Sequence, residues 1–175
     1  MRHARPMVPD GVCYGALDLA ADPQATQMAA QALANVLPRN AVLCTSPLQR
    51  CERLAQVMQG LRPDLLYKLD TRLREMNFGQ WEGQRWDAIP KQALSVWTDD
   101  FWQHRFGGAE SVAEVMTRVA KAWDEAASTG QPQVWVTHAG VIRAAMLIAQ
   151  GLRTLNDASL WPVKAPDYGE WICLE

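Results

Sequence analysis

Long apolar runs, cysteine motifs and clustered histidines are all missing from this chain of 175 residues. Its longest apolar run, AAMLIA at 144–149, is too short to span a bilayer, and no apolar segment of a signal peptide follows Arg2. The 17 basic residues are balanced by 19 acidic ones and form no stripe, which argues against nucleic acid or an anionic membrane as partner. We therefore expect a cytoplasmic protein.

The cysteines and histidines are few and scattered. Four cysteines, at positions 13, 44, 51 and 173, show no CxxC spacing, and the three histidines stand at 3, 104 and 138. Metal ligation requires ligands that converge, so this pattern predicts neither a metal site nor a cofactor. Buried, reduced thiols are the state expected for such cysteines in a cytosolic protein.

What the chain does contain is an ordinary globular composition, 49% hydrophobic and 21% charged, in which helical and strand patterns alternate. Its length, without repeats or linker-like breaks, predicts a single domain over residues 1–175. Strands are expected at 41–45, 65–69 and 134–138, with a final edge strand at 169–175. Helices are expected at 23–37, 48–61, 112–127 and 141–152, the first three capped by Asp22, Ser46 and Ser111, with a helical stretch broken by proline at 86–104. This alternation predicts an α/β sheet with both faces covered and with ligands beyond the carboxyl ends of its strands.

Residues able to bind or transfer an anion stand close to those strand ends. Arg50 lies one helical turn after Ser46, where a guanidinium and free N–H groups at a helix start favour an anion. His138 ends a strand, and Glu75 lies on a loop after another. Each residue alone also has a plainer explanation, as a surface arginine, a structural histidine or a solvated glutamate.

Five motifs that follow one another along the chain favour a functional role over these plainer explanations. They are Arg2-His3-Ala4, TSPLQRCERLA at 45–55, LREMNFGQWEG at 73–83, GGAES at 107–111 and VTHAGVIR at 136–143. Together they resemble the histidine phosphatase superfamily, also called the phosphoglycerate-mutase-like or RHG family, over nearly the whole chain. The stretch CYGALDL at 13–19 further resembles the α-ribazole phosphatase branch of that family.

The resemblance implies a three-layer α/β/α fold and a role for each motif residue. His3 would be the nucleophile that becomes phosphorylated, Arg2 and Arg50 would hold the phosphoryl oxygens, and His138 would complete the pocket. Glu75 would donate the proton to the leaving group. Arginines grip a phosphomonoester dianion in planar, bidentate fashion, and we expect a histidinium to add a further positive donor. Neighbouring cations should keep His3 neutral, as a nucleophile must be.

Three positions depart from the family pattern. Ala4 replaces a glycine, and Pro9 replaces an asparagine that contacts phosphate in many relatives. Relatives also place an apolar strand before the Arg-His pair, whereas only Met1 precedes it here. The first central strand of the fold is thus largely missing, and His3 is expected on a short, frayed end. Either the true start lies upstream or this form is compromised.

Three functions are compatible with this pattern. The first is a phosphomonoester hydrolase acting on a small-molecule ester, with α-ribazole 5′-phosphate in cobalamin biosynthesis as the substrate we would test first. The second is a phosphoglycerate mutase, which the short stretch between Gly83 and Ser111 disfavours because it leaves little chain for a lid. The third is a non-catalytic relative that binds phosphate esters. Trp81, Trp86, Trp97 and Trp102 could line an aromatic cleft or simply pack in the core.

Overall fold

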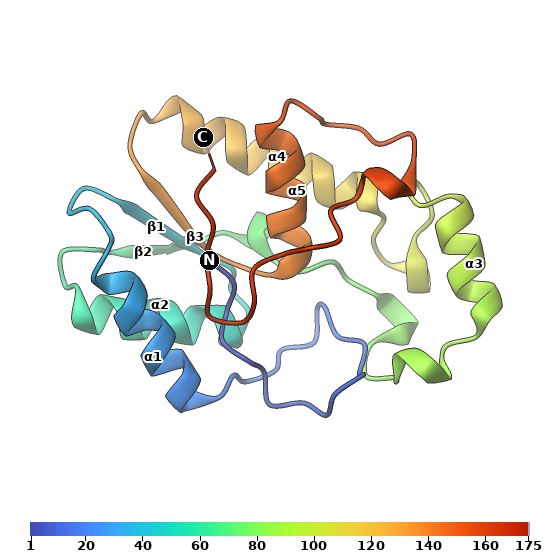
Figure 1. Ribbon diagram of the computed structural model, residues 1–175, viewed down its shortest axis with the longest axis horizontal. Coiled ribbons are helices and arrows are strands. Elements are labelled where there is room, and N and C mark those ends of the chain that lie inside the picture. The colour runs from blue at the N-terminus through green and yellow to red at the C-terminus, as the bar shows by residue number, and fades with distance from the viewer. Residues whose placement is uncertain (175) are drawn as a thin grey trace.

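The computed structural model describes residues 1–174 and has three layers, in which helices cover both faces of a small parallel sheet (Figure 1). Its strands are β1 (Val42–Thr45), β2 (Tyr67–Leu69) and β3 (Gln133–Val136), in the order β2-β1-β3. Leu43 of β1 is level with Tyr67 on one side and Val134 on the other. The expected α/β/α architecture is confirmed.

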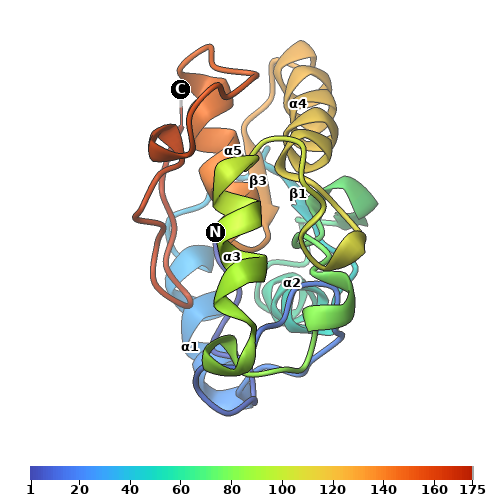
Figure 2. The same ribbon diagram turned by 90° about the vertical axis from the view of Figure 1, so that its right-hand side faces the viewer.

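The helices divide between the two faces of the sheet. Helices α1 (Pro23–Ala34) and α2 (Gln49–Leu61) pack together below it, and α4 (Val112–Ser128) and α5 (Ala139–Ala149) pack together above it (Figures 1 and 2). Helix α3 (Lys91–Asp99) lies at one end, away from the strands. No helix within residues 1–174 is long and apolar enough to cross a membrane.

Capping side chains start two of the helices where the sequence predicts. Asp22 accepts the Ala25 N–H at 2.7 Å, and Pro23 occupies the first turn of α1. Ser111 and Glu114 form a reciprocal capping box at α4, an arrangement whose cap alone is worth about 1 kcal/mol. The expected Ser46 cap of α2 is wrong, because that helix begins at Gln49 and Ser46 points toward His138 instead.

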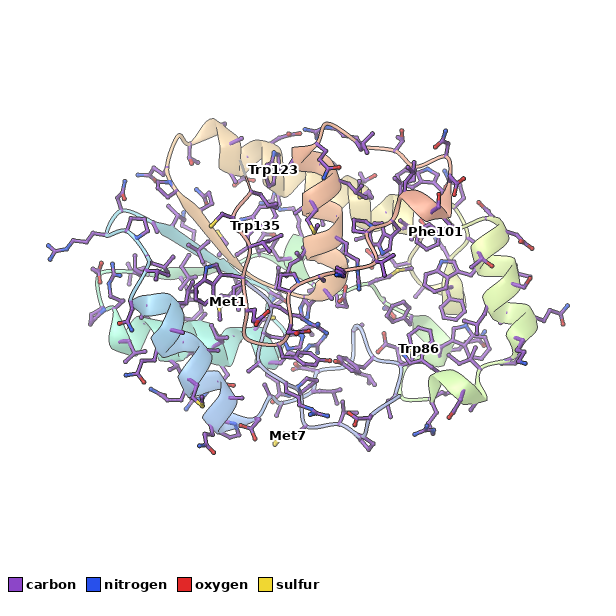
Figure 3. The ribbon with its side chains drawn as sticks, in the orientation of Figure 1. Met1, Met7, Trp86, Phe101, Trp123 and Trp135 are labelled. Atoms are coloured by element: carbon purple, nitrogen blue, oxygen red, sulfur yellow. The ribbon has the colours of Figure 1, made fainter. Side chains whose placement is uncertain are left out.

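Each face of the sheet has its own core. One cluster joins buried residues of α4 and α5, including Val115, Val119 and Val141, and reaches Trp123 and Trp135, which meet edge-on at 6.1 Å. Figure 3 shows these two tryptophans on the α4 side of the sheet. The other cluster joins the buried faces of α1 and α2 to the strands.

A third cluster of aromatic rings lies under α3, around the buried Phe106. The Trp97 ring stacks on Phe106 at 4.4 Å, and the Trp86 ring at 6.0 Å with an interplanar angle of 2°. Trp81 packs on the same ring, and Trp102 packs against the α4–α5 core. Packing therefore accounts for most of the tryptophans suspected of lining a cleft.

Two sequence expectations fail outside the helices. Residues 169–174 form no strand, since their backbone pairs with the first residues only at Arg2 and His3, through Glu170 and Gly169; Glu175 lies outside the described residues. The four cysteines are free, but only Cys13 and Cys51 are buried, whereas Cys44 is half-buried and Cys173 exposed.

Candidate functional site

The five predicted site residues all lie near the carboxyl edge of the sheet. His3 follows the isolated parallel bridge between Arg2 and Thr137, which continues the β3 side of the sheet. Arg50 stands in the first turn of α2 after β1, and His138 stands between β3 and α5. Glu75 follows the short helical turn after β2. This is the edge at which parallel α/β sheets bind their ligands.

The start of the chain is firmly held, contrary to the expected frayed end. The Met1 ammonium donates to the Trp135 carbonyl at 2.7 Å, and the Thr137 N–H donates to the Met1 carbonyl at 2.9 Å. The His3 N–H in turn donates to the Thr137 carbonyl at 3.0 Å, and His3 is only 2% exposed. His3 is therefore held in place by the backbone that continues β3.

The His3 ring has a defined tautomer. Its Nδ1 lies 2.7 Å from the Ala4 carbonyl, which can only accept, so Nδ1 carries the proton and Nε2 carries the lone pair. Burial, together with the guanidiniums of Arg50 and Arg2, lowers the pKa of His3 from 6.5 to about 3. The imidazole is thus neutral at physiological pH, in agreement with the argument from neighbouring cations.

His138 lies directly against His3, with 5.0 Å between the ring centroids. Its Nδ1 accepts from Arg50 Nε at 3.3 Å, so its Nε2 carries the proton and donates to Ser46 Oγ at 2.8 Å. Complete burial, then the nearby His3 and Arg50, hold the pKa of His138 well below 6.5. The expectation of a histidinium here is therefore wrong for the unliganded site.

Arg50 is fully buried although it carries a charge. Besides its bond to His138, it donates from Nη1 to the Leu17 carbonyl and from Nη2 to the Gly15 carbonyl, both at 2.6 Å. Its guanidinium carbon also lies 5.5 Å from the centre of the Tyr14 ring. The neighbouring turn, rather than a capped helix start, places Arg50 beside the two histidines.

Glu75 is fixed against the first turn of α5. Its Oε2 accepts the Gly140 N–H at 3.1 Å, and its Oε1 accepts the Met76 N–H at 3.0 Å. A Cβ atom at position 140 would lie 2.3 Å from Glu75 Oε1. The glycine of the VTHAGVIR motif is therefore what allows this carboxylate to approach the helix.

A cavity of about 350 Å³ opens beside His3. Arg2, His3 and Glu75 line it, whereas Arg50 and His138 do not. Tyr14 and Tyr168 also line it, and their hydroxyls meet at 2.6 Å across 154 residues of sequence. Of the four tryptophans considered as lining of a cleft, only Trp86 lines the cavity. Pro9, which replaces the asparagine of the family pattern, lines it as well.

Tyr168 connects the C-terminal segment to the site. Its ring centre lies 3.8 Å from the Arg2 guanidinium carbon and 5.6 Å from the His3 ring centre. Sequence reasoning missed this residue, because nothing around it matches one of the five motifs. It missed Tyr14 as a site residue as well, although CYGALDL was noticed for another reason.

Arg143 is a further cavity residue that sequence reasoning did not single out, although it stands within the VTHAGVIR motif. Its Nε atom is buried without a hydrogen-bond partner, as is the Nε atom of Arg2. Within residues 1–174 only one other buried side-chain nitrogen or oxygen, Trp97 Nε1, lacks a partner. Buried donors normally find acceptors, and both arginines line the same cavity, so together they indicate a place for an anion.

The arrangement is suited to anion chemistry without a metal-ligand cluster. No group of three or more histidine, cysteine, aspartate or glutamate side chains converges anywhere in the part of the chain described. A neutral imidazole with a free lone pair stands beside two arginines and a carboxylate. Such a set can bind a dianion, attack it and move a proton.

The protein has a three-layer α/β fold with histidines and arginines at its strand ends. Sequence comparison identifies the class of protein that has these features. The model of the histidine phosphatase superfamily (branch 1) matches residues 1–169, and the chain belongs to that family. Glucosyl-3-phosphoglycerate phosphatase of Mycolicibacterium vanbaalenii is 33% identical over 147 residues, which cover 77% of this chain and 62% of that protein. The enzyme of the same name from Mycobacterium tuberculosis is 32% identical over 134 residues, 69% of this chain and 57% of that protein.

Solved structures show the same fold. The mycobacterial glucosyl-3-phosphoglycerate phosphatase in complex with inorganic phosphate matches with a TM-score of 0.71 and 26% identity, covering 86% of this chain and 77% of that one. A protein from Thermus thermophilus matches with a TM-score of 0.67 and 27% identity, covering 87% and 83%. The chain spans about three-fifths of the length of the curated relatives it matches.

Proposed function

We propose that this protein is a phosphomonoester hydrolase that acts through a phosphohistidine on His3. The observation that carries the proposal is the pair of arginines, Arg2 and Arg143, which line the cavity beside His3 and each have one buried guanidinium nitrogen without a partner. They favour a dianionic ligand within reach of a neutral imidazole. The family and its phosphatase relatives support the same reading.

The reaction would proceed in two displacements at phosphorus. The Nε2 lone pair of His3 forms a bond to phosphorus while the ester P–O bond breaks, and Glu75, which enters this step in its protonated form, gives that proton to the departing oxygen. Water then attacks the phosphohistidine, Glu75 takes back a proton, and the P–N bond breaks to release phosphate and neutral His3. Arginine donors stabilise the charge spread over the equatorial oxygens in both steps.

Arg50 and His138 would reach those oxygens once a ligand enters. Both are buried and neither lines the cavity, so we infer that the contact between Tyr14 and Tyr168 gives way on binding. An incoming dianion offsets the effect of the Arg50 and Arg2 charges on His138 and raises the pKa of His138, since an opposite charge favours the charged form.

The substrate proposal has two candidates. CYGALDL at 13–19 supports α-ribazole 5′-phosphate, and Tyr14 from that stretch and Trp86 provide aromatic surface on the cavity wall for a flat base. The mycobacterial relatives are named for glucosyl-3-phosphoglycerate, whose anionic glycerate would suit Arg143. We further propose that residues 1–175 form one domain, supported by the family match over 1–169.

The function is tested by measuring phosphate release from both candidate esters and from p-nitrophenyl phosphate. We expect release from at least one, and lower affinity for inorganic phosphate as a competitive inhibitor in Arg50→Ala. Movement of the phosphoryl group between the two positions of phosphoglycerate, without release, would instead indicate the mutase. Binding of esters without turnover would indicate a non-catalytic relative.

A further inference from the structure

Glu82 is the most heavily hydrogen-bonded carboxylate near the site, yet it does not line the cavity. Its Oε1 accepts the N–H groups of Ala16 and Phe78, both at 2.9 Å. Its Oε2 accepts those of Gly15 at 2.9 Å and Leu17 at 3.0 Å. A carboxylate has about four lone-pair positions, so four backbone donors saturate it.

The segment at 15–17 has no helix or strand to hold its shape, and Glu82 takes that role. Three successive N–H groups point to the carboxylate, while the carbonyls of Gly15 and Leu17 accept from Arg50. A Cβ atom at position 15 would lie 1.8 Å from the Met76 carbonyl oxygen, so only glycine fits in this turn. The turn therefore connects Glu82 on one side with Arg50 on the other.

The turn also binds Arg50 through neutral groups, which bring no counter-charge to the guanidinium. No carboxylate within residues 1–174 forms an ion pair with Arg50, whose guanidinium is fully buried. Neutral carbonyls solvate it without cancelling its charge, whereas a carboxylate in direct contact would neutralise it. Glu82 thus fixes the guanidinium from a distance, through peptide groups, and leaves its positive charge for an anionic ligand.

We propose that Glu82 is a positioning residue for the phosphate site: it folds the 15–17 turn so that two carbonyls hold Arg50 against His138. This inference rests on the proposed function, because its purpose is to aim Arg50 at a phosphoryl group. Glu82 touches neither the cavity nor the two histidines, so its effect on phosphate must pass through Arg50.

The first test measures the dissociation constant of inorganic phosphate for the wild type and for Glu82→Gln. A glutamine oxygen can accept only two of the four N–H groups, so the turn loosens and Arg50 loses its fixed position. We expect phosphate to bind roughly tenfold to a hundredfold more weakly, the size of effect that misplacing a site group has. An unchanged constant in the folded variant overturns the proposal.

The matched control is Glu110→Gln. Glu110 also clamps a nearby loop, accepting from the Asn77 N–H at 3.0 Å and from Arg118, but it has no connection to Arg50. We expect this variant to bind phosphate within about twofold of the wild type, even where its Tm falls. Equal weakening in both variants would show that Glu82 acts only through general stability.

A double-mutant cycle with Arg50→Ala separates positioning from a merely structural role. If Glu82 acts through Arg50, adding Glu82→Gln to Arg50→Ala weakens phosphate binding no further. Losses that multiply would contradict the proposal. Failure of the wild type to bind phosphate at all would instead contradict the proposed function.

Amide hydrogen exchange of the wild type tests the turn without any substitution. We expect the N–H groups of residues 15–17 to exchange slowly for a segment without secondary structure, because each is bonded to Glu82. Exchange as fast as in an unstructured loop would overturn the proposal even if Glu82→Gln failed to fold.

Discussion

At the scale of single residues, the immediate surroundings of each site residue set its protonation state or its hydrogen bonds. The Ala4 carbonyl fixes the His3 tautomer, and burial keeps the ring neutral. Arg2 and Arg143 carry donors without acceptors, which a dianion would satisfy. Glu75 stands on the cavity wall, held by two backbone N–H groups.

If Glu75 donates the proton, the loss of kcat on replacing it should depend on the leaving group of the ester. In Glu75→Gln we expect kcat for an alkyl phosphate to fall roughly a hundredfold or more, because an alkoxide leaves poorly without a proton. The fall for p-nitrophenyl phosphate should be far smaller, since nitrophenolate needs little protonation. Steady-state kinetics on the two esters measures this, and equal losses would count against the acid role.

The candidate residues themselves could be predicted from the sequence, but their environment could not. Motif order identified His3, Glu75, His138, Arg2 and Arg50, and the structure brings them to one edge of the sheet. Tyr168 comes from a segment far along the chain without a motif, so only the folded structure shows its contact with Arg2. The neutral state of His138 likewise depends on burial that no local pattern shows.

At the scale of elements, a helix start could be predicted where a local cap decides it, but not where a distant residue uses the same side chain. Asp22 and Ser111 are local caps, and local chemistry decides them. Ser46 looks like the same signal, yet its hydroxyl is used by His138, a residue 92 positions away. The expected strand at 169–175 alternates correctly, but pairing partners decide whether a strand forms, and 169–174 have few.

The first turn of α5 should tolerate no side chain at position 140. In Gly140→Ala the new Cβ would lie 2.3 Å from Glu75 Oε1, so the carboxylate must move away from its place. We expect kcat to fall roughly tenfold to a hundredfold, as misplaced catalytic groups do. Kinetics at saturating ester measures this effect.

Gly60→Ala is the matched control, since Gly60 also lies in a helix but has open space where a Cβ would be. There we expect unchanged kcat and a gain of about 0.5–1 kcal/mol in the free energy of unfolding. Unchanged kcat in Gly140→Ala as well would contradict the placement of Glu75.

At the scale of the whole molecule, burying two neutral histidines makes the fold sensitive to acid. The pKa of His3 is about 3 in the folded chain and 6.5 when unfolded, and that of His138 is also well below 6.5. Between these values the unfolded chain binds more protons, so the free energy of unfolding falls as pH falls. Each histidine contributes about 1.4 kcal/mol per pH unit within that window.

Urea titrations between pH 6 and 4.5 measure this slope. In His3→Gln we expect the slope to be shallower by the contribution of one histidine. Identical slopes in the wild type and in His3→Gln would contradict the buried, neutral state of His3.

The central claim is that His3 carries the phosphoryl group, and trapping the intermediate tests it most directly. Rapid denaturation during turnover of a labelled ester should leave label on the wild type, stable to base and released by acid, as a phosphoramidate is. We expect label in His104→Ala and none in His3→Ala, with the labelled peptide containing residue 3. Label that persists in His3→Ala, or rapid hydrolysis with no label on the wild type, would contradict the account.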